Sequence, residues 1–239
     1  MNDPLLLQLR IRDKISDEEA EILVKSFTAQ RYYAADQDIV AQDSRPTSSQ
    51  LLMEGFAGRY KILADGSRQI SAVHVPGDFM DLHGFLLKEM AHGVVALTPC
   101  RLALVEHSTL KRLSETQPHL TRMLWLDTLI DGSIHREWIV AMGRRDAVSR
   151  MAHFVCELYV RLKLVKMVDE MSFRLPLTQS EIADIFGMSL VHVNRTIQSL
   201  RREGAIRWEG EMVTIDNWAQ LARLAEFNDT YLCLNSEPR

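Results

Sequence analysis

Apolar and polar positions change their spacing along the chain, and these changes divide it into three parts. Between residues 31 and 105, short runs rich in β-branched and aromatic residues alternate with turn residues, which is typical of successive β-strands. Asp65-Gly66 separates two such runs and favours the tight turn of a β-hairpin. Regularly spaced short strands indicate a small β-barrel or jelly-roll-like β-roll. A short amphipathic helix is expected before them, over residues 16–28.

The second part has the period of one long helix, from about Thr116 and Pro118 to Met142. It carries more apolar surface than a single contact face requires, which favours packing on both its own domain and a partner helix. A single buried core helix is the alternative. The positions at heptad spacing are Leu120, Met123, Asp127, Ile130, Ile134, Glu137 and Ala141, and a second stripe holds Leu126, Leu129 and Val140.

The third part contains two short helices joined by a tight turn, between Thr178 and Gly204. Thr178 and Glu181 have the spacing of a capping box, in which side chain and backbone satisfy each other at a helix start. Gly187 provides the left-handed residue that ends the first helix, and Ser189 is suited to cap the second. Helix, glycine turn and helix is the pattern of a helix-turn-helix, whose second helix enters the DNA major groove.

One face of the second helix carries side chains suited to DNA bases. It combines an arginine for guanine, amides for adenine or phosphate, and apolar groups for thymine methyls. An ordinary helical hairpin with a solvated polar face is the alternative interpretation. At about 100° per residue, this face comprises Leu190, Val191, Asn194, Arg195, Gln198 and Arg202.

The remaining C-terminal elements complete a winged helix. An amphipathic helix from about Val148 to Leu162 precedes the helix-turn-helix, and a short hairpin over residues 205–215 follows it. A last helix is expected to run to Phe227, and the polar tail over residues 229–239 is expected to be loosely ordered.

Composition narrows the functional classes. With 239 residues, 46% hydrophobic and 25% charged, the chain suits a soluble protein of two domains. The net charge of −4 gives no argument for nucleic acid, but basic residues concentrate in the C-terminal half. There is no membrane-spanning run and no signal-peptide pattern, so a cytoplasmic protein without membrane contact is expected. Phosphate-loop, zinc-protease and nucleophile-elbow motifs are all missing, so no enzymatic activity is expected.

Taken in order, these parts resemble the Crp/Fnr superfamily of bacterial transcription regulators. The most specific segment is Leu177–Gly204, L-T-Q-S-E-I-A-D-I-F-G-M-S-L-V-H-V-N-R-T-I-Q-S-L-R-R-E-G. Looser matches are M-E-G-F-A-G-R-Y-K at Met53–Lys61, D-G-S-R-Q-I at Asp65–Ile70 and P-G-D-F at Pro76–Phe79. The resemblance implies an α+β fold with an N-terminal β-roll, a long dimerisation helix and a C-terminal winged helix-turn-helix.

The implied boundaries and partners follow from that family. Residues 1–115 would form a cyclic-nucleotide-binding-like effector domain, 116–143 the dimerisation helix, 144–228 the DNA-binding domain and 229–239 a C-terminal tail. The implied function is a homodimeric regulator that binds a near-palindromic operator in double-stranded DNA and contacts RNA polymerase. A different class of function remains open: a ligand- or redox-sensing module whose winged helix contacts protein.

Arg195 occupies the position where the family places its guanine-reading arginine, and a guanidinium reaches guanine bidentately. The sequence departs from the family at Val191, where many relatives carry a glutamate that accepts from cytosine. The hypothesis is therefore that Leu190 or Val191 meets a thymine methyl, while Asn194 or Gln198 supplies amide contacts. The candidate DNA contacts are Thr178, Ser180, Ser189, Leu190, Val191, His192, Asn194, Arg195, Gln198 and Arg202.

The effector region lacks the residues that hold a cyclic nucleotide in relatives. Met90-Ala91 stands near the Arg-Ser position, and no arginine occurs between Gln69 and Cys100. Because a buried phosphate needs a cation, classical cAMP binding is not expected, and Lys88 is the one substitute in this stretch. The candidate effector-pocket residues are Asp81, Leu82, His83 and Lys88.

Metal cofactors are not expected either. The cysteines Cys100, Cys156 and Cys233 are widely spaced and lack zinc or iron–sulfur spacing, and Cys100 and Cys156 are interpreted as buried thiols. The N-terminus has no cysteine cluster for an iron–sulfur centre. Haem is not expected, because lone histidines such as His83 are more often structural or surface groups.

Overall fold

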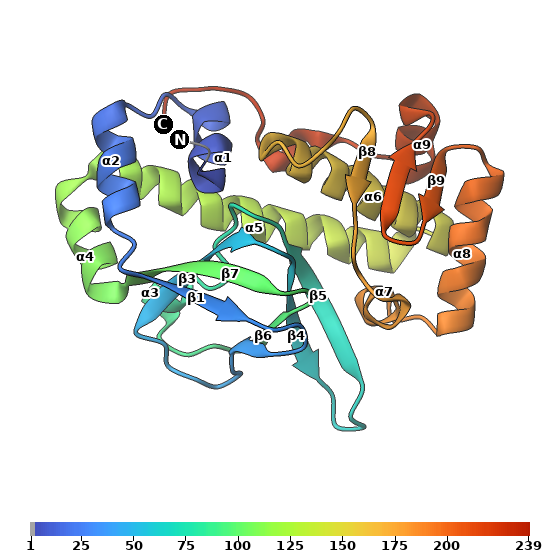
Figure 1. Ribbon diagram of the computed structural model, residues 1–239, viewed down its shortest axis with the longest axis horizontal. Helices are drawn as coiled ribbons and strands as arrows, with labels where there is room; N and C mark the ends of the chain where they lie inside the picture. Colours follow the sequence, from blue (N-terminus) through green and yellow to red (C-terminus); the bar gives the residue numbers. More distant parts are fainter. Residues whose placement is uncertain (1–2) are drawn as a thin grey trace.

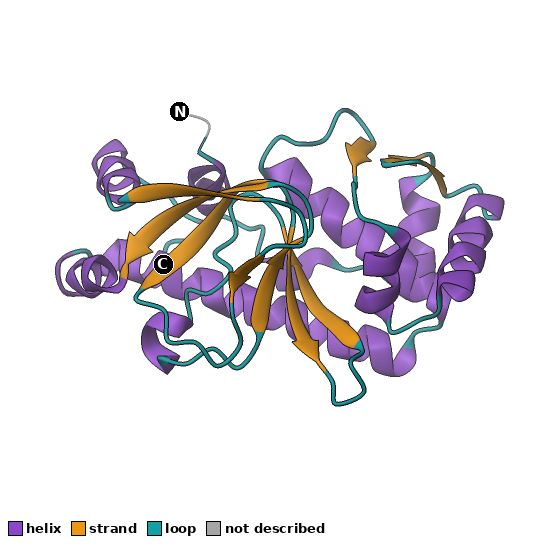
Figure 2. Cartoon of the chain, turned by 60° about the horizontal axis from the view of Figure 1, so that its bottom comes forward, coloured by secondary structure: helices purple, strands orange, loops and turns teal. Residues whose placement is uncertain are grey.

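The computed structural model describes residues 3–239 and shows a β-roll, one long helix and a helical C-terminal module (Figures 1 and 2). Within those residues the β-roll consists of two antiparallel sheets. The whole chain thus has the α+β fold class that the sequence predicted. One sheet has the order β1 (Ala29–Tyr33), β7 (Cys100–Glu106), β3 (Ser48–Glu54). The other has the order β2 (Asp38–Val40), β6 (Gly93–Ala96), β4 (Ala57–Ile62), β5 (Arg68–His74).

The hairpin predicted at Asp65-Gly66 joins β4 to β5. Gly66 has a φ of +84°, which a side chain would make costly. Asp65 Oδ1 accepts a hydrogen bond from the Ser67 backbone N–H at 2.9 Å. The turn projects from the body of the β-roll (Figure 1).

Short helices surround the β-roll, and two of them were not predicted. The sequence predicts α2 (Asp17–Lys25) and, as a short helix that opens at Ser108, α4 (His107–Thr116), whereas α1 (Pro4–Arg12) and α3 (Gly84–Leu87) are new. In α1, Asp3 Oδ1 accepts from the first-turn amides of Leu5 and Leu6 at 3.0 and 3.2 Å. Leu5, Leu6 and Leu9 are all buried, so this helix is part of the core.

The long helix α5 (Pro118–Arg144) passes behind the β-roll and reaches the C-terminal module (Figure 1). It continues to Arg144, past Met142 where the sequence predicted its end, so Gly143 lies inside it. Its predicted heptad stripe packs within the same chain and is not available to a partner. The buried members of that stripe are Leu120, Met123, Ile130, Ile134 and Ala141.

Another apolar stripe on α5, which shares only Leu129 with the predicted stripe of Leu126, Leu129 and Val140, faces away from the chain. Trp125, Leu129, Gly132 and Ile139, here called the free seam, follow one another at intervals of four, three and seven residues. This is the a/d spacing of a coiled coil. Trp125 and Ile139 are each 65% exposed, and burying one such side chain stabilises by about 1.5–3 kcal/mol. The seam therefore favours a second copy of α5 as its cover.

The C-terminal module is a winged helix-turn-helix. Its helices are α6 (Ala147–Leu164), α7 (Gln179–Phe186), α8 (Leu190–Arg202) and α9 (Trp218–Ala225). The small antiparallel sheet has the order β8 (Ser172–Arg174), β10 (Met212–Ile215), β9 (Ile206–Glu209). In residues 3–239 no helix is both long and apolar enough to span a membrane.

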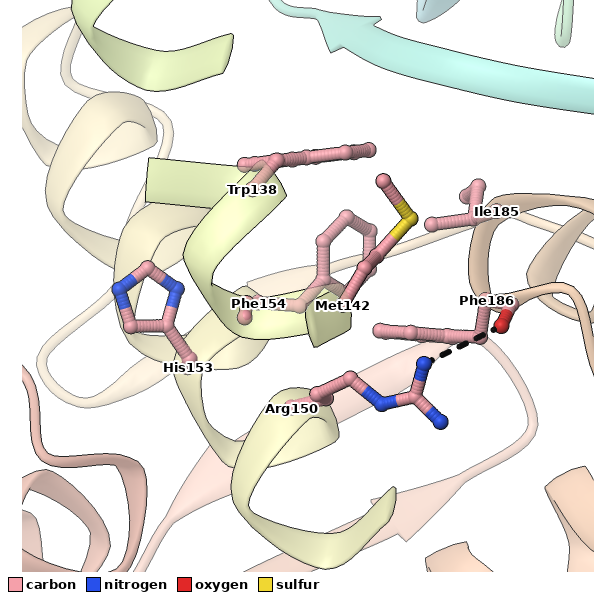
Figure 3. Close-up of a pocket in the computed structure, with 8 residues that line it drawn as sticks. Trp138, Met142, Arg150, His153, Phe154, Ile185 and Phe186 are labelled. Atoms are coloured by element: carbon pink, nitrogen blue, oxygen red, sulfur yellow. Dashed lines mark hydrogen bonds between the residues drawn. The ribbon is translucent and has the colours of Figure 1, made fainter. Parts of the chain in front are cut away.

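Aromatic side chains connect the long helix to the helix-turn-helix (Figure 3). The ring centroids of Trp138 and Phe154 lie 5.9 Å apart, and those of Phe154 and Phe186 lie 5.5 Å apart, both edge to face. Arg150 adds a hydrogen bond of 3.5 Å to the backbone oxygen of Phe186. These side chains line a small apolar pocket, and their contacts fix α5, α6 and α7 against one another.

A buried polar cluster ties α6 to the β-roll and to the C-terminus. Glu157 is fully buried and accepts from Trp138 Nε1, Arg161 Nη1 and the Tyr231 hydroxyl at 2.9–3.2 Å. Arg161 also reaches Asp78 of the β-roll, with an Nη2–Oδ2 distance of 2.5 Å. A buried charge requires such partners, because removing one would leave the others unpaired.

The expectation of a loosely ordered tail was wrong. A 3₁₀ turn at Asp229–Leu232 is followed by a segment that packs against the N-terminal region. The backbone amides of Glu237 and Arg239 donate to the Arg12 carbonyl at 3.0 Å and to Asp13 Oδ2 at 2.6 Å. The C-terminus therefore lies beside the last turn of α1 and the residue that follows it.

The hairpin of the β-roll contacts the first helix of the helix-turn-helix. Arg68 pairs with Asp184 at 2.8 Å, and Gln69 Nε2 donates to the backbone oxygens of Asp184 and Ile185 at 2.9 and 3.0 Å. These carbonyls lie in the last turn of α7, where a helix leaves its acceptors unpaired. Gln69 thus closes the C-terminal end of α7.

The His119 cluster predicts a pH-dependent contribution to stability. Hydrogen bonding to Glu19 and then Asp13 raises the pKa of His119 above 6.5. The stabilisation by protonated His119 is complete below its unfolded pKa of about 6.5, and it is lost as the pH rises through the higher pKa of the folded protein. We expect His119→Gln to cost about 0.5–1 kcal/mol at mildly acidic pH, where Glu19 and Asp13 are still ionised, and less in alkaline solution, by urea unfolding. An equal cost at both pH values would contradict the charge-based role, and exposed His192→Gln is the control.

The free seam predicts a change of oligomeric state. Ile139→Glu places a charge at a position where two copies of α5 would meet, so sedimentation should show a monomer where the unchanged protein is a dimer. Ile62→Glu is the matched control, since Ile62 is similarly exposed, at 59%, but lies on the hairpin. A dimer that survives Ile139→Glu would exclude the seam as the interface.

Candidate nucleic-acid interface

The two helices are joined as the sequence predicted. Thr178 Oγ1 accepts from the Glu181 backbone N–H at 3.2 Å, and Glu181 Oε2 accepts from the Thr178 N–H at 2.6 Å. Gly187 ends α7 with a φ of +60°. Ser189 Oγ accepts from the His192 backbone N–H at 3.3 Å and starts α8. The caps set the angle between the helices without using the outer face of α8.

α8 has one buried face and one free face. Its buried side chains are Val193, Thr196, Ile197 and Leu200. Arg195 lies on the exposed side and forms no ion pair within residues 3–239, so its guanidinium is available to a ligand. The other predicted contacts on that side are Leu190, Val191, His192, Gln198 and Arg202, all of them exposed.

Asn194 differs from the other predicted contacts because its amide already has partners. Its Nδ2 donates to Gln179 Oε1 at 2.9 Å and to the Leu190 backbone oxygen at 3.1 Å. Gln179 was not among the sequence candidates. It begins α7, fifteen residues before Asn194, and no sequence spacing announces a contact between two helices.

The candidate DNA contacts that carry hydroxyl groups lie at helix starts, which suits phosphate binding. Ser180 and Ser189 are exposed in the first turn of α7 and at the cap of α8, where free amides and the helix dipole favour anions. Thr178 is also exposed, but its hydroxyl lies 2.8 Å from Glu181 Oε2 and takes part in the capping box.

The wing has an acidic tip. Glu209 and Glu211 flank Gly210 in the turn between β9 and β10. Glu211 is paired with Arg174 at 2.6 Å, and Arg207 is paired with Asp216 at 2.9 Å. Since carboxylates repel phosphate, α7 and α8 present the surface best suited to DNA.

The predicted effector residues separate into three environments. Asp81 is fully buried, its Oδ1 accepts from the Gln50 backbone N–H at 2.6 Å, and burial raises its pKa to about 7. Leu82 and His83 line an apolar groove of about 550 Å³ between α3, α4 and α5. Burial lowers the pKa of His83 to about 4, so its imidazole is neutral at physiological pH. Lys88 is exposed and donates to the Phe85 carbonyl, outside the groove.

A buried arginine that the sequence reasoning missed lies in the β-roll. Arg59 of β4 is 5% exposed and contacts Asp131 at 3.0 Å, His135 Nε2 at 2.9 Å and the Met80 carbonyl at 3.0 Å. Asp131 already neutralises it, so a cyclic phosphate would have to displace that carboxylate. Arg59 is thus a cation that is already paired, whereas Lys88 is a cation on the surface.

Metal-binding groups do not gather in the described structure. Within residues 3–239, no three side chains of His, Cys, Asp or Glu are placed to hold a metal ion. Burial raises the pKa of Cys100 to about 11 and that of Cys156 to about 12, which disfavours the thiolate form required for metal binding or oxidation.

Two family models match the chain in the order of its structural parts. The model of the cyclic nucleotide-binding domain matches residues 30–117, which include the β-roll and α4. The model of the Crp-like helix-turn-helix domain matches residues 149–224, which include α7, α8 and the wing.

Curated relatives are transcription regulators. The chain is 28% identical over 209 residues to the transcriptional activator protein FnrL of Cereibacter sphaeroides, covering 86% of this chain and 84% of that one. It is 30% identical over 180 residues to the nitrogen fixation regulation protein FixK of Bradyrhizobium diazoefficiens, covering 73% of each.

A solved structure extends the similarity to the three-dimensional arrangement. FixK2 from Bradyrhizobium japonicum superimposes with a TM-score of 0.74 at 25% identity, covering 82% of this chain and 96% of that one. The β-roll, the long helix and the helix-turn-helix thus share the order and the arrangement that they have in FixK2. Together with the family models and the relatives, this shows that the chain belongs to the Crp/Fnr family of DNA-binding transcription regulators.

Proposed function

We propose that the protein acts as a homodimer that reads a near-palindromic operator with α8 of each protomer. The observation that carries this proposal is the free face of α8, on which Arg195 forms no ion pair within residues 3–239 while both helix starts are capped. A guanidinium in that position reaches guanine O6 and N7 together. The relative FnrL is a transcriptional activator, and the free seam on α5 supplies a surface for the second copy.

The other contacts divide into base and phosphate groups. Leu190 and Val191 are exposed at the start of α8 and suit thymine methyl groups. Gln198 and Arg202 continue the same face towards the end of the helix. Ser180 and Ser189 offer hydroxyls and nearby amides to phosphates. This division gives the operator a guanine at the Arg195 step and thymine beside it.

We propose that an effector other than cAMP controls the protein, without haem or an iron–sulfur cluster. Two basic residues of the β-roll support this proposal. Arg59 is already paired with Asp131, and Lys88 is exposed. The raised pKa values of Cys100 and Cys156 argue against thiolate ligands. An absorption spectrum of the purified protein tests the haem and cluster part, because either group would give visible bands.

Contact with RNA polymerase and action in the cytoplasm, where the DNA lies, belong to the same proposal. The competing hypothesis is a ligand- or redox-sensing module whose winged helix binds protein. Salt dependence separates the two, since contacts to phosphates release counterions and make affinity fall steeply with salt. Operator affinity that is insensitive to salt would favour the protein-binding module.

The base-reading role of Arg195 gives a direct test. We expect Arg195→Ala to weaken operator binding by about 1–3 kcal/mol and to relax selectivity at one base pair in each half-site, by fluorescence anisotropy on single-base operator variants. Arg112→Ala removes the same charge from α4, far from α8 (Figure 1). It should leave the affinities for all single-base operator variants unchanged. If Arg195→Ala weakened every variant equally, Arg195 would be a phosphate contact.

A further inference from the structure

We propose that Gln179 is a positioning residue for sequence recognition, which makes Asn194 read DNA through its carbonyl oxygen alone. Gln179 would at the same time bind a backbone phosphate through its own amide nitrogen. Both parts concern residues on the surface between the first turn of α7 and the middle of α8. The proposal rests on the DNA-binding function and adds a base preference at one position of the operator.

The orientation of the Asn194 amide is fixed by its neighbours. Its amide group lies 3.1 Å from the Leu190 backbone oxygen, which is an acceptor only, so Nδ2 must face it. The second Nδ2 hydrogen points to Gln179 Oε1 at 2.9 Å. Both donor hydrogens of Asn194 are therefore used inside the protein. Only Oδ1 remains for a ligand, and it can only accept.

An acceptor in the major groove selects bases by their amino groups. Cytosine N4 and adenine N6 donate there, whereas guanine O6 and thymine O4 accept. An asparagine with free donors instead prefers adenine, because it bonds N6 and N7 together. In the orientation that Gln179 imposes, Asn194 should therefore prefer adenine or cytosine over guanine and thymine at the base that it contacts.

The same contact leaves the other end of the Gln179 amide free. Oε1 faces Asn194, so Nε2 points away from it and makes no hydrogen bond within residues 3–239. Gln179 is exposed at the first position of α7, beside Ser180. At a helix start that faces DNA, a free amide N–H is positioned to donate to a phosphate oxygen. Gln179 would thus join a phosphate contact to a base contact.

Gln198 provides an internal comparison on the same helix. It is exposed on α8, and its side-chain amide makes no hydrogen bond within the described chain. Its donors are free, so it can bond adenine bidentately where Asn194 cannot. The two amides therefore predict different base preferences at different positions of one half-site.

The test selects DNA from a random pool with the unchanged protein, Gln179→Glu and Gln179→Ala. For the unchanged protein, one position should hold adenine or cytosine, with guanine and thymine about fivefold less frequent, as expected for a single contact. Gln179→Glu keeps the acceptor for Asn194 but replaces the phosphate donor with a negative charge. It should retain this preference while binding every sequence more weakly.

Gln179→Ala should behave differently at that position, because it releases Nδ2 of Asn194. Adenine should then gain over cytosine by about fivefold, and Asn194→Ala should remove the preference in either background. The Gln198→Ala variant should change a different position. Equal melting temperatures of the variants would show that the exposed substitutions leave the fold intact.

Three results would overturn the proposal. One is a selected site without any position shared by adenine and cytosine. The second is an Asn194→Ala variant whose base preferences equal those of the unchanged protein. The third is an identical set of base preferences for Gln179→Glu and Gln179→Ala, since the acceptor that Gln179→Glu keeps would then have no effect.

Discussion

Two opposite faces of α5 must be covered, and a single chain covers only one of them. The buried face, with Met123 and Ile130, is covered by the chain's own domains. The free seam leaves Trp125 and Ile139 in solvent, where their apolar surface favours association. Because the same helix ends against the DNA-binding module, the requirement to cover the seam also places two recognition helices in one particle.

Several contacts then hold the DNA-binding module in a defined orientation on α5 and the β-roll. The aromatic series Trp138, Phe154 and Phe186 joins three helices, and the ion pair of Arg161 with Asp78 joins α6 to the β-roll. Gln69 reaches the end of α7 from the hairpin. The β-roll thus directly contacts α7, the helix that precedes α8.

The features that the sequence predicted well are local ones. The capping box of Thr178, the turn at Gly187 and the hairpin at Gly66 each depend on residues within four positions of one another. The missed features depend on distant pairs. Arg59 meets Asp131, and Asn194 meets Gln179, only after the chain has folded. The heptad of α5 was visible, but its spacing could not say which of two stripes the chain itself buries.

The missed elements have a similar cause. Helix α1 is short and buried on most sides, so it lacks the alternation that marks an amphipathic helix. The tail after Asp229 is polar, yet its backbone amides bond to Arg12 and Asp13 at the other end of the chain. Composition predicts disorder where a segment has no partner, and here the partner is more than two hundred residues away in sequence.

The central claim is that two copies of α8, fixed by paired α5 helices, read one symmetric site. Hydroxyl-radical footprinting of the dimer on its selected DNA tests it most directly. The account predicts two protected regions in inverted half-sites, with centres about 10 base pairs apart on one side of the duplex. A single protected half-site, or two in direct repeat, would contradict it.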